Sequence, residues 1–205
     1  MKLHESIGPN PRVVKMFIAE KGLEIPRQQV DLLAGENRRE PFTNLNPSGQ
    51  TPALETDEGL VLAEITAICE YLEELHPNPP LIGTTPMQRA ETRMWVRRID
   101  LNILEPMANG FRYSEGLRMF ENRMRCLPEA SQGLKTIARE KLEWLDDKIA
   151  GRQWVVGDRF TLADIMLYAF LEFGAQVGQP LDAKNTHVAA WQERVKARPS
   201  VKASA

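Results

Sequence analysis

A proline-rich break at residues 76–86 constrains the fold more than any other feature of this 205-residue sequence. It begins with His76-Pro77-Asn78-Pro79-Pro80, which cannot continue a helix, because proline lacks an amide hydrogen and clashes with the preceding turn. The segments before the break are short and mixed in type, whereas every long segment after it has helical periodicity. We therefore expect two domains, residues 1–76 and 87–205, joined by a linker at 77–86.

The first part alternates short extended runs with amphipathic helices. The extended runs are predicted at 2–4, 28–32, 53–55 and 60–62, and the helices at 11–21 and 64–75. Asp57-Glu58-Gly59 is typical of a hairpin turn, so the last two strands should be antiparallel. This order predicts an α/β domain with a mixed four-stranded sheet.

The second part is predicted to be all-helical. Its apolar periodicity predicts helices at 87–108, 116–127, 134–149, 162–177 and 188–198. Thr161 and Asp164 have the spacing of a capping box, in which each side chain satisfies a free backbone amide of the other. This cap is a folding signal and carries no chemistry.

Composition limits the classes of partner. Lys plus Arg (26) nearly balances Asp plus Glu (28), so the net charge of −2 gives no reason to expect nucleic acid or an anionic membrane. The apolar runs are too short to span a membrane and the N-terminus has no signal-peptide core, so we expect a cytoplasmic protein. His4, His76, Cys69 and Cys126 have no metal-ligand spacing; we expect no metal site and two small buried cysteines.

The segment Asn46-Pro47-Ser48-Gly49-Gln50-Thr51-Pro52-Ala53-Leu54 predicts a binding site for a small anionic peptide. Pro47 and Gly49 indicate a turn, and Pro52 opens or flanks the next strand, which leaves nearby backbone groups available to a ligand. Glu64 follows at a helix start, where free amides can hold a carboxylate while the glutamate side chain binds an ammonium group.

Together these features resemble the cytosolic glutathione S-transferases of bacterial type. The resemblance rests on Met1-Lys2-Leu3, Arg12 to Leu23, Asn46 to Leu54, Glu64 with Ala67-Ile68 and Tyr71-Leu72, the cap at Thr161, and Trp191 to Val201. It implies a thioredoxin-like fold for residues 1–76, a cis bond before Pro52, glutathione as co-substrate and a homodimer. It also implies transfer of glutathione to a hydrophobic electrophile, as in detoxification.

The resemblance assigns the residues that hold glutathione. The backbone of Thr51, beside Pro52, should pair with the cysteinyl part like an added strand, and Gln50 should contact the ligand. Glu64 and the backbone of Ile65 should hold the γ-glutamyl end. Because many relatives have a serine where this chain has Ile65, one side-chain hydrogen bond worth about 1 kcal/mol is missing and binding should be weaker. Asp100 resembles a residue that reaches across a dimer to the γ-glutamyl ammonium group.

Activation of glutathione requires a thiolate, and a free thiol with a pKa of about 8.5 is mostly protonated at neutral pH. The loop Ser6-Ile7-Gly8-Pro9-Asn10-Pro11-Arg12 contains neither the tyrosine nor the cysteine that several classes of the family use. The candidate donors to sulfur are the Asn10 amide, the Ser6 hydroxyl and backbone amides of the first helix. Asn10 could instead be only a helix N-cap. Gly8 occupies the usual serine position, and Arg12 either adds positive potential or is a solvated residue of the first turn.

Met107, Phe111 and Tyr113 are candidates for the electrophile pocket, although ordinary core packing explains the first two equally well. Two other functions stay open. One is glutathione-dependent reduction of disulfides or peroxides, which needs no protein cysteine. The other is a non-catalytic relative that uses the fold as a protein-interaction module.

Overall fold

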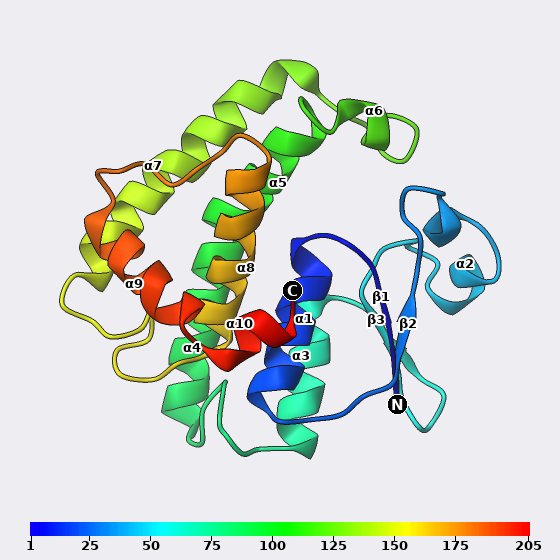
Figure 1. Cartoon of the computed structure of the whole chain (residues 1–205), viewed down its shortest axis with the longest axis horizontal. Helices are drawn as coiled ribbons and strands as arrows, with labels where there is room; N and C mark the ends of the chain where they lie inside the picture. The colour runs from blue at the N-terminus through cyan, green and yellow to red at the C-terminus, as the bar shows by residue number, and fades with distance from the viewer. The chain divides into compact units, whose positions relative to one another are not determined.

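The computed structural model describes residues 1–205, which divide into one unit of residues 1–84 with 198–205 and a second unit of residues 85–197 (Figure 1). The sequence prediction ended the first domain at residue 76 and placed the C-terminal segment in the second. In the structure, the C-terminal segment completes the first unit.

The first unit contains a mixed four-stranded sheet, as predicted. Its strands are β1 (Lys2–Glu5), β2 (Arg27–Gln29), β3 (Ala53–Glu55) and β4 (Val61–Leu62), in the order β2-β1-β3-β4. β1 pairs parallel with β2 and antiparallel with β3, and β3 pairs antiparallel with β4. The prediction that the second strand runs to residue 32 is wrong. The strand ends at Gln29, because Asp31 begins a turn in which its Oδ1 accepts a hydrogen bond from the Ala34 amide at 2.9 Å.

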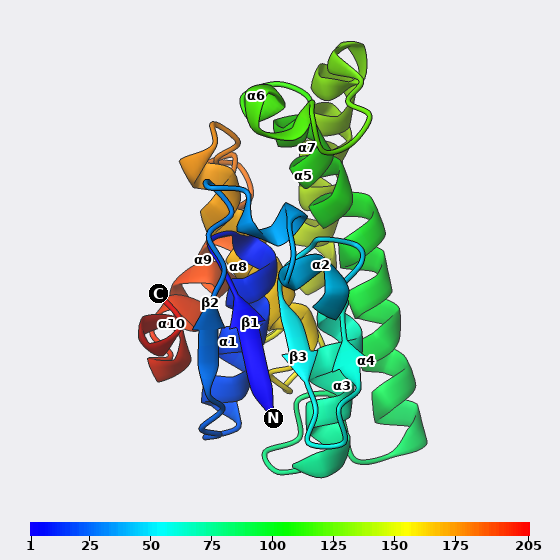
Figure 2. The same ribbon diagram turned by 90° about the vertical axis from the view of Figure 1, so that its right-hand side faces the viewer.

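Helices cover both faces of this sheet. Figure 1 shows α1 (Pro9–Glu20) and α3 (Ile65–Leu75) on one side and the short α2 (Phe42–Leu45) on the other; η1 (Glu36–Arg38) precedes α2. Figure 2 shows β1 between β2 and β3. The fully buried core residues include Leu3, Val14, Phe17, Leu54 and Ile68. The sheet and the α1–α3 layer therefore enclose one apolar core.

A buried lysine at the end of α1 holds the linker segment. The Lys21 side chain is 0% exposed, and its Nζ donates to the Glu73 carboxylate. It also donates to the carbonyls of His76, at 2.7 Å, and Pro79, at 2.6 Å. The ammonium group therefore has three acceptors from α3 and the segment that follows it.

Glu73 completes this buried network from the other side. Besides Lys21, its carboxylate accepts hydrogen bonds from the amides of Leu81 at 3.2 Å, Ile82 at 2.9 Å and Gly83 at 3.4 Å. One ion pair thus satisfies backbone groups along most of the proline-rich segment, where regular secondary structure cannot do so.

A second carboxylate fixes the C-terminal helix α10 (Pro199–Ala203) on α1. Glu20 accepts two hydrogen bonds from the Arg198 guanidinium, both at 2.7 Å, and one from the Ser200 hydroxyl at 2.5 Å. Burial alone would raise the pKa of Glu20, but the hydrogen bonds from Arg198 and Ser200 outweigh it and the pKa lies below its ordinary value.

The second unit is all-helical, as predicted. A long helix runs through α4 (Pro86–Ile99), a π-helical turn η2 (Asp100–Leu104) and α5 (Glu105–Arg112). It is followed by α6 (Leu117–Phe120), η3 (Pro128–Ala130), α7 (Ser131–Ile149), α8 (Leu162–Gln176) and α9 (Thr186–Lys196). The prediction of a helix over 116–127 is wrong beyond Phe120. No residue of α6 is buried, so packing does not stabilise a longer helix there.

The predicted capping box at Thr161 and Asp164 is present and belongs to a larger network. Asp164 is 0% exposed and accepts hydrogen bonds from the Val155 amide at 2.9 Å, the Thr161 amide at 2.9 Å and Trp191 Nε1 at 2.8 Å. Burial raises the pKa of Asp164 to about 6, while these donors act in the opposite direction. The carboxylate thereby connects the start of α8 to α9 and to the loop that precedes α8.

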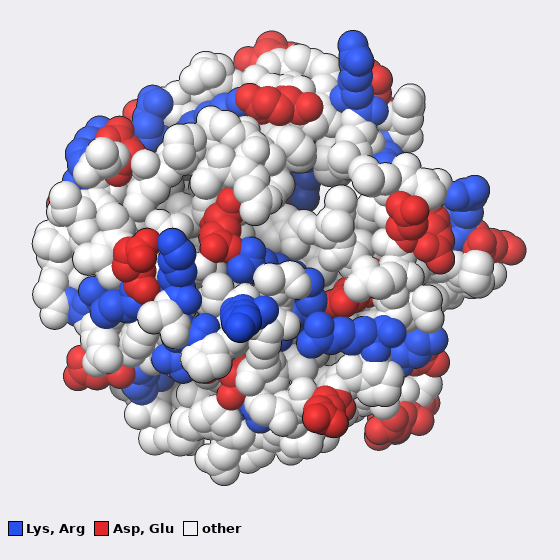
Figure 3. Space-filling view, in the orientation of Figure 1, with Lys and Arg blue, Asp and Glu red and all other residues white.

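The surface carries both charge signs. Lys and Arg side chains are interspersed with Asp and Glu over the face shown in Figure 3. No helix combines the length and the apolar character that crossing a membrane requires. Cys69 is buried as predicted, but Cys126 is only partly buried, and neither forms a disulfide.

Candidate functional site

The backbone amide and carbonyl of Thr51 are available to a ligand. The Thr51–Pro52 bond is cis, as the resemblance implies, and Pro52 is buried directly before β3. Neither the amide nor the carbonyl of Thr51 has a hydrogen-bond partner in the chain. A free donor and a free acceptor therefore lie together at the end of a sheet strand, where an extended peptide can add its own backbone.

Two asparagines brace the loop that leads to Thr51. Asn46 is 5% exposed; its Nδ2 donates to the Gln50 carbonyl at 2.8 Å, and its Oδ1 accepts from the Ser48 amide at 3.2 Å. Asn37 donates to the Gly49 carbonyl at 2.6 Å. Asn37 was not foreseen, because it precedes the motif and no local pattern relates it to the loop.

Gly49 fits this brace in a way that larger residues cannot. Its φ is +63°, and an added Cβ would lie 2.9 Å from the Asn37 carbonyl oxygen. Both observations require glycine at this position. These contacts fix the backbone that leads to Gln50 and Thr51.

Glu64 has an unusual backbone conformation at the start of α3. It is the only non-glycine residue with positive φ (φ 68°, ψ 122°), and it occupies the N-cap position. Its exposed carboxylate makes no hydrogen bond or ion pair within the chain, and the Ile65 amide also has no partner. Such strain is most often retained at ligand sites. The helix start thus offers a carboxylate beside free amides.

The start of α1 differs from the prediction. The helix begins at Pro9 with Gly8 as N-cap, so Asn10 lies inside the first turn and the prediction that it could be the N-cap is wrong. Gly8 has φ +115°, a conformation that favours glycine and places the cap two residues earlier. The partly buried Asn10 side chain makes no hydrogen bond in the chain and remains available as a donor. Arg12, also partly buried, lies in the same helix.

The structure brings Ser6 and Thr51 together. Their hydroxyl oxygens are 2.5 Å apart, and the Ser6 hydroxyl also donates to the Ile7 carbonyl at 3.2 Å. Ser6 is 6% exposed. A hydroxyl has one proton to donate, so these bonds compete with any hydrogen bond from Ser6 to a ligand.

The remaining predicted residues lie in the second unit. Asp100 begins the π-helical turn η2, with an oxygen 3.8 Å from Arg97. Met107 is 2% exposed and packs near Gly174, and Phe111 makes an edge contact with Phe173 at 5.2 Å. These contacts favour the packing alternative for Met107 and Phe111. Tyr113, at the end of α5, is only partly buried.

Comparison with known proteins identifies the class to which this fold and site belong. The chain is a member of the glutathione S-transferase family: the model of the family's N-terminal domain matches residues 7–75 and that of its C-terminal domain matches residues 117–199. Glutathione is the co-substrate of this family.

Individual relatives extend over nearly the whole chain. Glutathione S-transferase 2 of Saccharomyces cerevisiae is 32% identical, over 95% of this chain and 84% of that protein. The crystal structure of Gtt2 from Saccharomyces cerevisiae has a TM-score of 0.93 at 30% identity and covers 100% of both chains. FtsZ-localized protein A of Caulobacter vibrioides is also 32% identical, over 96% of this chain and 86% of that protein.

Proposed function

We propose that the protein is a glutathione transferase, which binds glutathione on the first unit and activates its thiolate for attack on a hydrophobic electrophile. The observation that carries this proposal is that the backbone amide and carbonyl of Thr51, beside the cis bond to Pro52, have no partner in the chain. Its amide and carbonyl would pair with the cysteinyl residue of glutathione in the manner of an added strand. Gln50, held by Asn46, would contact the same ligand.

The γ-glutamyl end would bind at Glu64. The glutamate carboxylate has no partner in the chain and would accept the ammonium group, while the Ile65 amide would donate to the ligand carboxylate. Ile65 supplies no hydroxyl, so affinity should be lower than with the serine common at this position.

Asn10 is the favoured donor to sulfur. Its amide is unengaged and lies in the first turn of α1, where the helix dipole also stabilises negative charge. Ser6 is the weaker candidate because its hydroxyl already bonds to Thr51. Gly8 allows the turn, and Arg12 adds positive charge to it. After the thiol loses its proton to solvent, the sulfur bonds to the electrophilic carbon and the leaving group departs with the bonding electrons.

We also propose a homodimer. Met87, Met94 and Leu101 are spaced by seven residues on one helix and are 78%, 41% and 47% exposed, an apolar stripe typical of helix association. Asp100 would reach the γ-glutamyl ammonium group of glutathione bound to the other subunit. Tyr113 would line the electrophile pocket, with Met107 and Phe111 behind it. Light scattering of the protein and of Met94→Glu tests the dimer.

Calorimetry with glutathione tests the binding site. Glu64→Ala should abolish binding at millimolar ligand, whereas Glu24→Ala, which removes an exposed glutamate without a partner, should leave binding unchanged. Equal affinity in Glu64→Ala and the parent protein would refute the assignment of Glu64.

The thiolate test uses the absorbance of bound glutathione near 240 nm as a function of pH. Asn10→Ala should raise the bound-thiol pKa by about one unit, because one hydrogen bond to the anion is worth roughly 1.4 kcal/mol. Turnover of an aryl halide should fall with it. An unchanged pKa and rate would exclude Asn10 as the donor.

Two results would favour the other functions. Faster turnover of a small mixed disulfide than of any aryl halide would indicate a glutathione-dependent reductase. No binding of glutathione at millimolar concentration would favour a protein-interaction module. Two observations support this alternative: Ile65 replaces the serine common at its position, and one relative is named FtsZ-localized protein A.

A further inference from the structure

Two hydroxyl groups face each other at the point where β1 and β3 meet the loops of the candidate site. The β1–β3 register places His4 opposite Ala53, and its continuation places Ser6 opposite Thr51. The two hydroxyl oxygens are 2.5 Å apart. Because the backbone amide and carbonyl of Thr51 have no partner in the chain, this is the type of antiparallel position at which facing side chains lie closest.

The two hydroxyls differ in their access to a ligand. Ser6 is 6% exposed, and its hydroxyl bonds to Thr51 and to the Ile7 carbonyl. Thr51 is only partly buried, and its hydroxyl bonds to Ser6 alone. Thr51 is therefore the member of the pair that a ligand can reach, with Ser6 behind it.

The two protons of this pair allow two arrangements. If Ser6 donates to the Ile7 carbonyl, Thr51 must donate to Ser6. If Ser6 donates to Thr51, the Thr51 proton is free for a ligand. The second arrangement gives up only the longer bond, the 3.2 Å contact with Ile7. An anion beside Thr51 would select this arrangement, because an anion accepts hydrogen bonds and donates none.

The proposed binding mode brings the ligand sulfur to the face of the strands that carries these hydroxyls. Residues that are directly opposite in a hydrogen-bonded antiparallel pair have side chains on the same face, with Cβ atoms about 5 Å apart. The cysteinyl residue of glutathione, paired with the backbone of Thr51, would therefore direct its sulfur over the side of the Thr51 hydroxyl.

We propose that the Thr51 hydroxyl donates a hydrogen bond to the thiolate of bound glutathione, and that Ser6 is a positioning residue that donates to Thr51. This inference rests on the proposed function and adds a second donor beside Asn10. When the thiol ionises, its proton passes to solvent, the Ser6 hydroxyl turns from the Ile7 carbonyl to Thr51, and the Thr51 hydroxyl turns to the sulfur. In such a chain each hydrogen bond polarises the next, which strengthens the final bond to the anion.

The test compares the pKa of the bound thiol, measured from thiolate absorbance near 240 nm, with the affinity measured by calorimetry. Thr51→Val has nearly the same shape and the same backbone but no hydroxyl. It should raise the bound-thiol pKa by about one unit. At about pH 5, where the thiol is neutral, it should change the affinity by less than about threefold. Thr51→Ser, which keeps the hydroxyl, should restore the parent pKa.

Ser6→Ala tests whether Ser6 acts through Thr51. It should raise the bound-thiol pKa by about 0.3 unit, because a neighbouring bond strengthens a hydrogen bond by roughly 10–30%. It should have no further effect once Thr51 is valine, whereas independent contributions would add. Thr43→Val makes the same substitution at a partly buried threonine of α2 and should leave the pKa and the affinity unchanged.

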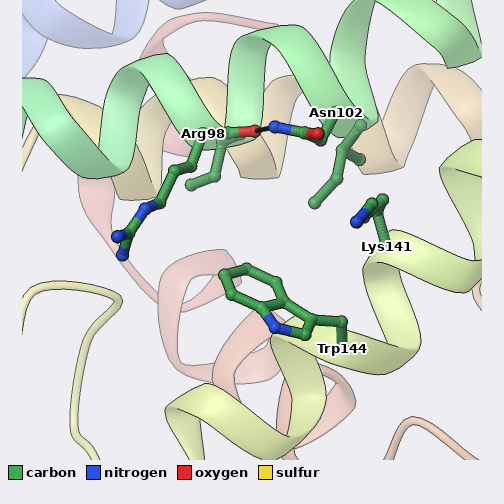
Figure 4. A pocket seen from close by; sticks show the side chains of 6 residues that line it. Arg98, Asn102, Lys141 and Trp144 are labelled. Atoms are coloured by element: carbon green, nitrogen blue, oxygen red, sulfur yellow. Dashed lines mark hydrogen bonds between the residues drawn. The ribbon is translucent and has the colours of Figure 1, made fainter.

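A second control addresses glutathione that is held elsewhere by charge alone. A cavity of about 280 Å³ lies on the second unit between the long α4–η2 helix and α7, with Arg98 toward one end and Lys141 toward the other (Figure 4). Lys141→Gln should change neither the affinity for glutathione nor the pKa of the bound thiol.

The outcomes separate this inference from the proposed function. An unchanged thiol pKa in Thr51→Val, with glutathione still bound, would overturn the role of the Thr51 hydroxyl and leave the proposed function standing. Additive effects of Ser6→Ala and Thr51→Val would overturn the role of Ser6. No binding of glutathione to the parent protein would overturn both the inference and the proposed function.

Discussion

Replacement of Glu73 by leucine should be among the most destabilising single changes in the first unit. The carboxylate is 7% exposed and is the only charged partner of the fully buried Lys21 ammonium. Glu73→Leu leaves that charge with two carbonyl acceptors and removes the acceptor of the Leu81 and Ile82 amides.

The structure predicts an order of effects. Removing one partner of a buried ion pair costs about 3–5 kcal/mol, and each buried amide left without an acceptor adds about 1 kcal/mol. Lys21→Met, which leaves Glu73 with its amide donors, should therefore cost about 3 kcal/mol. Glu73→Leu should cost about 5 kcal/mol or more, a large part of the usual 5–15 kcal/mol of total stability. The double variant should cost less than the sum, because no buried charge remains unpaired.

Urea unfolding followed by far-UV circular dichroism measures these differences. Tryptophan fluorescence, recorded in parallel, reports on residues 85–197, which contain all four tryptophans. Lys196→Met removes a lysine from an exposed pair with Glu193 and should change stability by less than about 0.5 kcal/mol. The reasoning is refuted if Lys21→Met is as damaging as Glu73→Leu, or if the two effects simply add.

Three further outcomes are expected. Because the folded pKa of Glu20 is lowered, its contribution to stability should be complete above about pH 4.5 and lost as the pH falls through the folded value; acid unfolding of Glu20→Gln should lack this step. Asp164→Ala should lower the free energy of unfolding, measured in urea, by about 3–5 kcal/mol, because it leaves the Trp191 indole N–H and the amides of Val155 and Thr161 without an acceptor. Asn46→Ala should weaken glutathione binding in calorimetry by about tenfold while Asn44→Ala, an exposed neighbour, does not, because only Asn46 holds the Gln50 carbonyl; equal affinities would show that the loop needs no brace.

Local patterns in the sequence predicted the mixed sheet, the helical character of the second part and the cap at Thr161, because apolar periodicity and capping depend on residues a few positions apart. They also predicted a helix beginning near Glu64. They missed the start of α1, since the +115° φ of Gly8 moved the N-cap away from Asn10. Local patterns do not predict the cis bond before Pro52, because few X-Pro bonds in folded proteins are cis; only the resemblance implied it.

The rest of the site depends on contacts that no short pattern encodes. The hydrogen bond from Asn37 to Gly49 and the contact between Ser6 and Thr51 join residues that are far apart in sequence. The ion pair between Lys21 and Glu73 is of the same kind. Each of these charged or polar residues could equally have been a surface residue, and only burial reveals its role.

The hydrogen bonds from Arg198 to Glu20 affect the order in which the first unit folds during synthesis. Because the segment Arg198–Ala205 packs on α1, the first unit lacks one of its helices until the intervening residues 85–197 have been synthesised. On the ribosome, the first unit is thus completed only after residues 198–205 have left the exit tunnel. A premature stop near residue 197 would therefore harm the amino-terminal unit, although residues 198–205 are far from it in the sequence.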